Sequence, residues 1–175
     1  MIARFCSACG APLREPPPTR CDACGVEHWR NPKPCANALV VSDGRVLLAR
    51  RARAPWRGGW AAPGGFCEAV EHPADAAERE VLEETGVRAR VTRLLGIWLD
   101  AYADDPGDAE ASTITVAYYL AELADGEAPG EPDPAETAEL GWFPLEALPA
   151  PLVPPGTLES VLEAARQALA QSERW

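Results

Sequence analysis

The sequence has no apolar run long enough to cross a membrane. Its longest apolar stretches, ANALVV at 36–41 and TITVAYYLA at 113–121, fall far short of the roughly 20 residues that a spanning helix needs. The first ten residues also lack the apolar core of a secretory signal peptide. Both absences argue against a membrane protein or a secreted one, and we expect a cytoplasmic protein without a membrane partner.

Basic residues are also scarce, since 16 Lys and Arg stand against 27 Asp and Glu, for a formal net charge of −11. This charge repels polyanions unless cations or a local basic patch intervene, so we expect no nucleic-acid partner. Residues 1–35 differ, with five basic and three acidic residues. With 47% hydrophobic and 25% charged residues, the 175-residue chain is typical of a soluble globular protein with one ordinary domain and a small module.

Four of the six cysteines stand in two C-x-x-C-G knuckles, CSACG and CDACG, and eleven residues separate the two pairs. This spacing is typical of a structural zinc ribbon with four thiolate ligands. The expected ligands are Cys6, Cys9, Cys21 and Cys24. A disulfide pair is disfavoured in a cytoplasmic chain, and a thioredoxin-like motif needs only one such pair. His28 is assigned to the surface or to packing, and Cys35 and Cys67 are interpreted as small buried residues.

The segment NPKP, residues 31–34, is interpreted as a boundary, because its prolines cannot continue a helix or a central strand. We predict a zinc ribbon over residues 1–31, a linker over 32–35 and a main domain over 36–175. In the main domain, apolar runs on both sides of Asp43-Gly44 predict a β-hairpin.

One helix is predicted over residues 73–85, because Pro73 suits a first helical position and Gly86 suits the residue after the C-cap. A second helix is predicted at GTLESVLEAARQALA, where apolar residues recur at helical spacing. Predicted strands are VRARV, LLGIWLDAY, STITVAYYLAEL and TAELGWF, and predicted loops are ARAPWRGGWAAPGG, ADDPGDAEA and ADGEAPGEPDPAE. Strands that flank helices without a repeat indicate a layered α/β domain.

The end of the first predicted helix carries three carboxylates, Glu80, Glu83 and Glu84, within about 100° of one another around the axis. They lie where the backbone carbonyl dipoles are already negative. A solvated acidic face would carry interspersed lysines, and this segment has none. Because such a cluster needs a cation and hard oxygen ligands favour Mg²⁺ or Mn²⁺, the helix predicts a divalent-metal site.

The segment RVLLARRARAPWR, upstream of that helix, holds five arginines and no acidic residue. A basic segment beside a metal site suits a phosphorylated substrate, although an exposed strand edge explains any single arginine equally well. Arg50 and Arg51 are candidate substrate contacts. Aromatic side chains that could stack on a base are Trp56, Trp60, Trp98 and Tyr102. We prefer Trp56, which lies in the predicted loop, and we predict that Trp98 is buried.

The residues around the helix match a named pattern: Gly65, five residues, Glu71, seven residues, Arg79-Glu80-Val81, one residue, Glu83-Glu84, one residue, Gly86-Val87. This pattern resembles the box of the Nudix hydrolases at every specified position, and the resemblance covers residues 36 to about 170. It implies a Nudix-type α/β/α sandwich with a mixed sheet behind the small β-rich ribbon. It also implies metal-dependent attack of water on a diphosphate that joins a nucleoside to another group.

The resemblance further implies roles for single residues. The implied Mg²⁺ or Mn²⁺ ligands are the Gly64 carbonyl, Glu80, Glu83 and Glu84, and the implied structural residues of the box are Gly65, Glu71, Arg79 and Gly86. Glu71 is expected to pair with Arg79, and the catalytic group comprises Glu80, Glu84 and Arg79. The general base stays open between Glu80, Glu84 and a later-loop carboxylate. Glu136 and Glu139 are candidates for that base or an extra ligand, with ordinary loop charges as the alternative.

The arrangement of a zinc ribbon ahead of a Nudix domain also resembles the NADH pyrophosphatases, but this chain departs from their pattern. LGIWLDAYADD stands where their Ser-Gln-Pro-Trp-Pro-Phe-Pro array is expected, and the chain is too short for their extra N-terminal domain. Smaller ribbon-bearing Nudix proteins that act on ADP-ribose or flavin dinucleotides look closer. We therefore expect an Mg²⁺-dependent pyrophosphohydrolase that cleaves an ADP-ribose- or FAD-like dinucleotide into a nucleoside monophosphate and X-phosphate.

Three other functions are kept as alternatives. The first is an oxidised nucleoside triphosphate pyrophosphatase. The second is a nucleotide-sensing regulatory protein whose ribbon binds nucleic acid or a protein partner. The third is a Nudix-like isomerase of isoprenoid diphosphates, which would be expected to depart from this box. A homodimer also stays open, because the ribbon could dimerise the chain as well as stabilise it.

Overall fold

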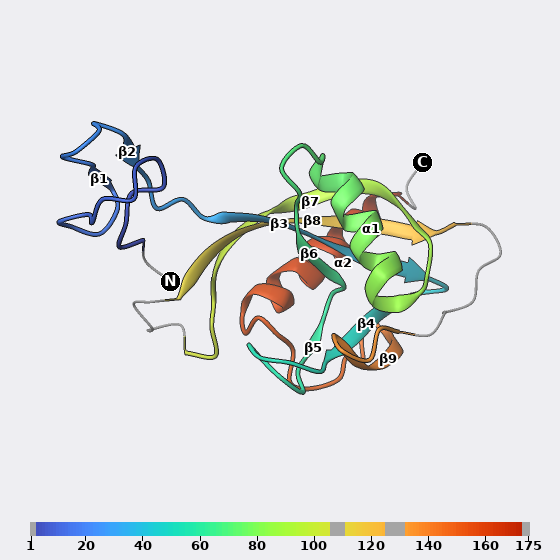
Figure 1. Ribbon diagram of the computed structural model, residues 1–175. Coiled ribbons are helices and arrows are strands. Elements are labelled where there is room, and N and C mark those ends of the chain that lie inside the picture. The colour runs from blue at the N-terminus through green and yellow to red at the C-terminus, as the bar shows by residue number, and fades with distance from the viewer. Residues whose placement is uncertain (1–2, 106–110, 125–131, 173–175) are drawn as a thin grey trace.

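The strands form one small and one large sheet (Figure 1). The computed structural model describes residues 3–105, 111–124 and 132–172. In chain order the elements are β1 (Thr19–Arg20), β2 (Glu27–His28), β3 (Lys33–Ser42), β4 (Arg45–Arg51), β5 (Trp60–Ala61), β6 (Gly64–Phe66), α1 (Pro73–Thr85), β7 (Ala89–Tyr102), β8 (Ser112–Leu123), β9 (Thr137–Pro144) and α2 (Thr157–Ser172). The small sheet, β1-β2, belongs to residues 3–31, which we call the cysteine module. This module lies beyond the first residues of β3, at the left of Figure 1.

The large sheet is mixed, as expected. Its strands run in the order β5-β4-β3-β8-β7, with β6 paired to β3 and β9 paired to β4. The central pair β3-β8 is parallel from Lys33↔Ile114 to Val41↔Glu122, and the other pairs are antiparallel. Since β6 pairs with only the first part of β3, it leads the chain directly from the sheet towards α1.

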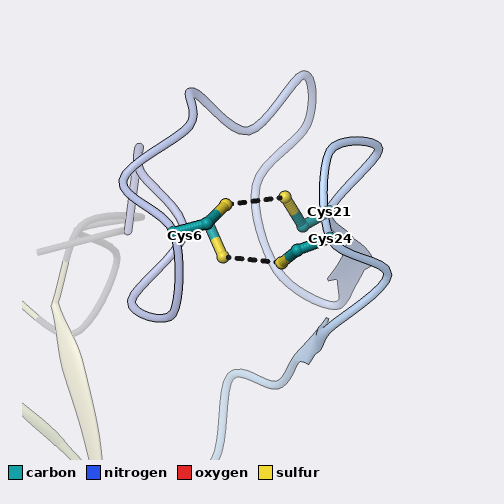
Figure 2. A group of neighbouring side chains, drawn as sticks. Cys6, Cys21 and Cys24 are labelled. Carbon is teal, nitrogen blue, oxygen red and sulfur yellow. Dashed lines mark hydrogen bonds between the residues drawn. The ribbon is translucent and has the colours of Figure 1, made fainter.

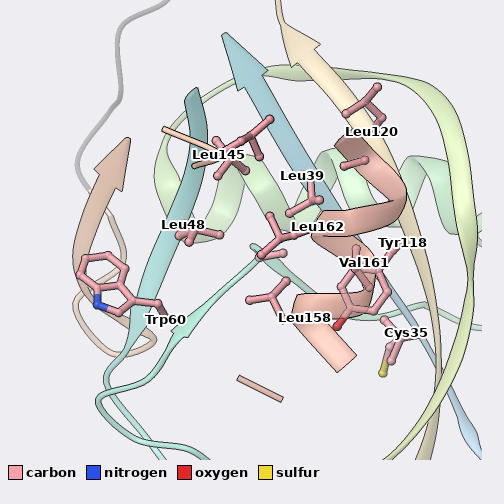
Figure 3. Close-up of a cluster of buried hydrophobic side chains, with 14 of the residues drawn as sticks. Cys35, Leu39, Leu48, Trp60, Tyr118, Leu120, Leu145, Leu158, Val161 and Leu162 are labelled. Carbon is pink, nitrogen blue, oxygen red and sulfur yellow. The ribbon is translucent and has the colours of Figure 1, made fainter. Parts of the chain in front are cut away.

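The two helices cover opposite faces of the large sheet. On one face, α2 buries Leu158, Val161 and Leu162 against Leu39 and Leu48 (Figure 3). On the other face, α1 packs small residues against small residues of β3. The buried side chains there include Ala76, Ala77 and Val81 of α1 and Ala36, Ala38 and Val40 of β3. Because alternate residues of a strand point to opposite faces, β3 supplies both layers of an α/β/α sandwich.

Local signals gave the hairpin and the first helix correctly. Asp43 and Gly44 have φ angles of 49° and 71°, as a type I′ turn requires, and Val41 pairs with Val46 across it. The first helix spans Pro73–Thr85, and Gly86 follows it with φ 68° and donates its N–H to the Leu82 carbonyl. The predicted helix bounds are therefore confirmed.

Other local predictions are wrong, because pairing over long distances overrides them. The second half of NPKP is part of the large sheet rather than a linker before it. Strand β3 begins at Lys33, and Pro34 pairs with Thr115 of β8. The Pro34 carbonyl accepts the Cys67 N–H at 3.0 Å. Pro34 thus keeps its acceptor in use on the β6 side, although its nitrogen has no hydrogen to donate.

The predicted loop ARAPWRGGWAAPGG contains β5 and the start of β6, and the two runs VRARV and LLGIWLDAY form one strand, β7. The other two predicted loops lie partly outside the described residues. Trp98 is only half-buried, although its ring packs edge-on against Tyr118 at 5.5 Å between centroids. No described helix has the length and apolar character needed to span a bilayer.

Candidate active site and cysteine cluster

A cavity of about 480 Å³ opens where the second half of α1 faces β6 and the first residues of β3. This volume is in the range of small-molecule sites. The side chains that line it include the acids Glu80, Glu83, Glu84, Asp133 and Glu136, the arginines Arg51 and Arg53, and the aromatics Trp56, Phe66 and Tyr102. The backbone of Gly64 and Gly65 forms part of the same wall. The fold thus brings most of the sequence-derived candidates into one site.

The local sequence explains how α1 presents its carboxylates. His72 caps the helix, because its Nδ1 accepts the Ala74 N–H at 3.1 Å, and Pro73 needs no partner at the first helical position. Gly86 ends the helix in a left-handed conformation. With Ala76 and Ala77 fully buried against β3, the helix lies close to the sheet, and its polar edge faces β6.

Arg79 donates hydrogen bonds from all five of its N–H groups within this site. Its Nε and Nη2 donate to the two oxygens of Glu71 at 2.8 and 2.9 Å, and its Nη1 donates to Glu80 at 2.8 Å and to Glu83 at 3.0 Å. The remaining Nη2 hydrogen binds the Phe66 carbonyl at 3.1 Å. A guanidinium has five donors, so none is left unsatisfied. Arg79 pairs with Glu71, as the resemblance implied, and ties α1 to β6.

This pairing perturbs both partners. The hydrogen bonds from Arg79 lower the pKa of Glu71 to about 2. The same bonds raise the pKa of Arg79 above its already high value. Glu71 also accepts the Glu68 N–H at 3.0 Å, which closes the turn ahead of α1. Glu71 therefore acts as a fixed negative charge that orients Arg79.

Glu84 and Glu80 are the less exposed carboxylates of the three, and Glu83 is the most exposed. Burial, assisted by the neighbouring carboxylates of Glu80 and Glu136, raises the pKa of Glu84 to about 7. Glu84 is held in place by the Gly64 N–H, which donates to it at 3.0 Å. Burial likewise raises the pKa of Glu80. Burial and mutual repulsion disfavour the charged forms of these carboxylates. A hard divalent cation bound between them would offset that repulsion and stabilise the charged forms.

Gly65 makes room for one of these carboxylates. A Cβ placed on Gly65 would lie 2.5 Å from the carboxyl carbon of Glu80, well inside van der Waals contact. The close approach of the β6 backbone to the Glu80 carboxylate therefore requires glycine at this position. The combination of a backbone cradle and three convergent carboxylates fits Mg²⁺ or Mn²⁺ in its ligand chemistry.

Three aromatic side chains, Trp56, Phe66 and Tyr102, form an aromatic wall of the same cavity. The Tyr102 ring meets Trp56 at 5.6 Å and Phe66 at 5.7 Å between centroids, both edge to face. The Arg51 guanidinium carbon lies 5.7 Å from the Trp56 ring centroid and 6.0 Å from that of Tyr102. Trp56 has φ 62°, an uncommon conformation for a bulky residue, and its N–H donates to Asp104 at 2.5 Å. The loop is thus held in a strained form that keeps Trp56 on the wall.

Of the two later-loop carboxylates proposed as base or extra ligand, Glu136 and Glu139, only Glu136 lines the cavity. Glu136 lines the cavity and pairs with Arg53 at 2.5 Å. Glu139 does not line it; its carboxylate lies 3.3 Å from the Arg50 Nη1. Arg50 is likewise outside the cavity wall, with its Nε donating to the Gly58 carbonyl. Arg50 and Glu139 therefore lie opposite each other across β4 and β9, at a distance from the cluster on α1.

Sequence reasoning did not single out Phe66, Arg53 or Asp104 for the site. Phe66 directly follows Gly65, so its place in the box was the available signal. Arg53 belongs to the five-arginine segment, but nothing in the sequence separates it from Arg50, which pairs with Glu139 across β4 and β9 and does not line the cavity. Asp104 lies in a predicted loop, and its contact with Trp56 joins segments that are far apart in the sequence.

The four cysteines of the two knuckles form one cluster (Figure 2). Their sulfurs all lie within 4.8 Å of one another, with Cys6 and Cys24 at 3.6 Å and Cys9 and Cys21 at 3.7 Å. A tetrahedral ion with Zn–S bonds of about 2.3 Å needs sulfurs about 3.8 Å apart. The cluster therefore fits a four-thiolate ion. His28 is half-buried beside the cluster and makes a side-chain hydrogen bond to Cys6.

Comparison with known proteins gives the same assignment. A family model, the NUDIX domain, matches residues 32–164. The NAD-capped RNA hydrolase NudC of Stutzerimonas stutzeri is 33% identical over 151 residues, which cover 84% of this chain and 50% of that protein. The ADP-ribose pyrophosphatase of Methanocaldococcus jannaschii is 33% identical over 121 residues, which cover 69% of this chain and 67% of that protein.

A solved structure agrees in fold. The MutT NUDIX hydrolase from Burkholderia pseudomallei is 34% identical, with a TM-score of 0.65 over 77% of this chain and 98% of that one. The chain spans about half the length of the S. stutzeri relative. Family model, relatives and fold agree with the carboxylate geometry of α1: the chain belongs to the NUDIX family.

Proposed function

We propose that the chain is an Mg²⁺- or Mn²⁺-dependent pyrophosphohydrolase of nucleoside diphosphates linked to a second group, with an ADP-ribose- or FAD-like dinucleotide as substrate. The observation that carries the proposal is one cavity that combines three convergent carboxylates, two arginines and an aromatic wall. The ADP-ribose pyrophosphatase among the relatives supports this substrate class. Water would add to one phosphorus, the bridging P–O bond would break, and the products would be a nucleoside monophosphate and X-phosphate.

Each group of residues has a role in this reaction. Glu80, Glu83 and Glu84, with the Gly64 carbonyl, would hold the divalent ions, which lower the pKa of a coordinated water and offset charge on phosphorus. Arg79 acts as a positioning residue, because its hydrogen bonds fix the carboxylates of Glu80 and Glu83.

The arginines and aromatic residues of the cavity would orient the substrate. The guanidinium groups of Arg51 and Arg53 are placed to bind phosphate oxygens, and the Trp56 ring offers a face for a base. The proton of the attacking water would pass to a carboxylate. Glu80, Glu84 and Glu136 are the candidates that share the cavity, and Glu136 is the later-loop carboxylate that the fold brings there.

The cysteine cluster is proposed to hold a structural Zn²⁺, and residues 1–31, 32–35 and 36–175 are proposed as ribbon, linker and catalytic domain. Four thiolates would leave no open position for a substrate. All six cysteines are unpaired, which fits the reducing cytoplasm that we propose as the location.

Substrate hydrolysis tests the proposal directly. ADP-ribose, FAD, NADH, dinucleoside polyphosphates and oxidised dGTP are each incubated with the protein and Mg²⁺, and products are separated by anion-exchange chromatography. We expect nucleoside monophosphate from ADP-ribose or FAD. Glu84→Gln should lower kcat/KM by about 100-fold or more, because a metal ligand in a preorganised site is lost.

The matched control is Asp75→Asn, which removes a carboxylate from the exposed first turn of the same helix, outside the cavity. It should keep wild-type turnover. Retained nucleotide binding without turnover of any substrate would contradict the hydrolase proposal and favour the regulatory alternative. Turnover of oxidised dGTP alone would select the triphosphate alternative.

A further inference from the structure

The large cavity extends past its carboxylates onto the face of the sheet that α2 covers. The strands β3 and β8 line it there with uncharged side chains, namely Cys35, Asn37, Ile114, Val116 and Tyr118. We call these five residues the β3–β8 wall. Asn37 lies on the same face as Cys35, because alternate residues of a strand point to the same side. The carboxamide of Asn37 is thus a polar group on an otherwise largely apolar wall.

The Asn37 carboxamide is held in one orientation. Its Nδ2 donates to the Ala62 carbonyl at 2.9 Å, and because a carbonyl can only accept, the amide nitrogen must lie on that side. Asn37 is paired with Gly64 of β6, and a Cβ on Gly64 would lie 2.4 Å from the Asn37 Cγ. The amide therefore packs directly against the backbone whose N–H binds Glu84.

The amide has hydrogen-bonding capacity left over. An asparagine side chain has two amide hydrogens and an oxygen that accepts. For the part of the chain that the structure describes, the bond to Ala62 is the one hydrogen bond that this side chain makes. Asn37 therefore presents a free acceptor and a free donor next to each other. Such an edge is a typical partner of adenine, which offers an amino hydrogen beside a ring nitrogen.

The neighbours of Asn37 suit adenine better than guanine. Tyr118 is paired with Asn37 in β8, and Cys35 lies near Tyr118 on the same face (Figure 3). Burial raises the pKa of Tyr118 and of Cys35, so both keep their hydrogens at neutral pH and can donate them. Adenine ring nitrogens accept such hydrogens. Guanine has an additional ring N–H and an amino group on another carbon, and the apolar Ile114 and Val116 offer these donors no acceptor.

We infer that Asn37 determines the base specificity of the cavity: its Oδ1 accepts an amino hydrogen of adenine, and its free amide hydrogen donates to the adjacent ring nitrogen. An aromatic face such as that of Trp56 attracts every base, because every base has a π-face. The edge of Asn37 adds the selectivity that a ring face lacks. This inference rests on the proposed function, and it narrows the substrate to a diphosphate that carries adenosine.

The test compares ADP-ribose with its analogue in which hydrogen replaces the 6-amino group of the base. The measured quantity is the ratio of kcat/KM for ADP-ribose to kcat/KM for the analogue. We expect a wild-type ratio of at least about five, because the analogue leaves Oδ1 of Asn37 without a donor. Asn37→Leu keeps the branched shape of the side chain without its polar atoms, so the ratio should fall to about one.

Asn31→Leu is the matched control. Asn31 is the other asparagine of the sequence, is exposed and does not line the cavity, so the same substitution there should keep the wild-type ratio. A second measurement does not depend on hydrolysis. Titration calorimetry with Mg²⁺ present reports the binding of AMP and of the AMP analogue without the amino group. The wild type should bind AMP more tightly, and Asn37→Leu should bind the two equally.

Each outcome has a separate meaning. Turnover of ADP-ribose with a wild-type ratio of about one would overturn the inference and leave the proposed function intact, even if Asn37→Leu does not fold. Equal losses of kcat/KM for both substrates in Asn37→Leu, at an unchanged ratio, would show that Asn37 only supports Ala62, and the inference would be wrong. A preference for AMP that requires Asn37, without turnover of any substrate, would support the inference and reject the hydrolase proposal.

Discussion

Arg79 and Glu71 show how single residues hold a strained set of charges in place. Arg79 pairs with Glu80 and Glu83 of its own helix, while Glu71 fixes its guanidinium from the turn before α1. Without this pair, the carboxylates at the end of α1 would repel one another next to the negative end of the helix dipole. Stability and function thus depend on the same side chains.

The lowered pKa of Glu71 predicts that the stability loss in a Glu71→Gln variant depends on pH. Its pKa is about 2 in the fold against an ordinary value of 4.5, so its stabilising contribution is fully present above about pH 4.5 and is lost as the pH falls through about 2. Glu71→Gln should therefore lower the urea midpoint most near neutral pH. The difference from wild type should shrink steadily below pH 4.5. Equal differences at pH 7 and pH 2.5 would contradict the assigned role.

Substitution of the two glycines before Phe66 by alanine should affect the melting temperature differently. A Cβ on Gly65 meets only the end of the flexible Glu80 side chain, so Gly65→Ala should keep the melting temperature and lower kcat/KM by about 10- to 100-fold, as Glu80 leaves its position. A Cβ on Gly64 would lie 2.4 Å from the Ala36 carbonyl oxygen, at φ 155°. Because backbone cannot swing away, Gly64→Ala should lower the melting temperature as well. Calorimetry beside the hydrolysis assay separates the two, and an unstable but active Gly65→Ala would oppose this account.

At the scale of elements, signals within a few residues were sufficient where one turn or cap decides the structure. Asp43-Gly44 fixed the hairpin, and Pro73 and Gly86 fixed both ends of α1. The other elements depend on strand pairing between segments that are distant in the sequence, and no local pattern predicts that pairing. Pro34 lies within β3 because β3 pairs with the distant strand β8 from Lys33 onwards, and no local pattern shows that Arg51 rather than Arg50 lines the cavity. The carboxylates of α1 were predictable because one helical turn places them together.

The edge strand β7 leads to a prediction about assembly. Within the described part of the sheet, β7 pairs only with β8, and its Leu94, Ile97 and Leu99 are half to two-thirds exposed. The helix α1 reaches only the first residues of β7, where Glu78 accepts the Val91 N–H. This apolar surface of β7 is therefore uncovered in a single chain.

We expect a second copy of the chain on this surface. Arginines lie towards the start of β7 and Asp104 follows its end, so antiparallel contact of two β7 strands places opposite charges together. Sedimentation velocity should show a species of twice the chain mass of 18.7 kDa, and Ile97→Glu should give the monomer. The control is Val70→Glu at a fully exposed valine outside the sheet. A wild-type monomer at high concentration would rule out this assembly.

At the scale of the whole molecule, the two parts are stabilised by different means. The NUDIX domain has an apolar layer on each face of its sheet. Within residues 3–31, by contrast, the buried side chains are those of Cys6 and Cys21, so there is no apolar core to offset the entropy of folding. We therefore expect the four cysteines to supply that stability by binding a metal.

Loss of the metal should unfold the cysteine module and spare the domain. Metal analysis of protein purified without added metal should find about one Zn²⁺ per chain. In Cys21→Ser, Cys24→Ser, the amide signals of residues 3–31 in a ¹H–¹⁵N correlation spectrum should move to unfolded positions, while those of β3, β8 and α2 stay dispersed. A dispersed module in the zinc-free variant would show that contacts with the domain, rather than the thiolates, hold it folded.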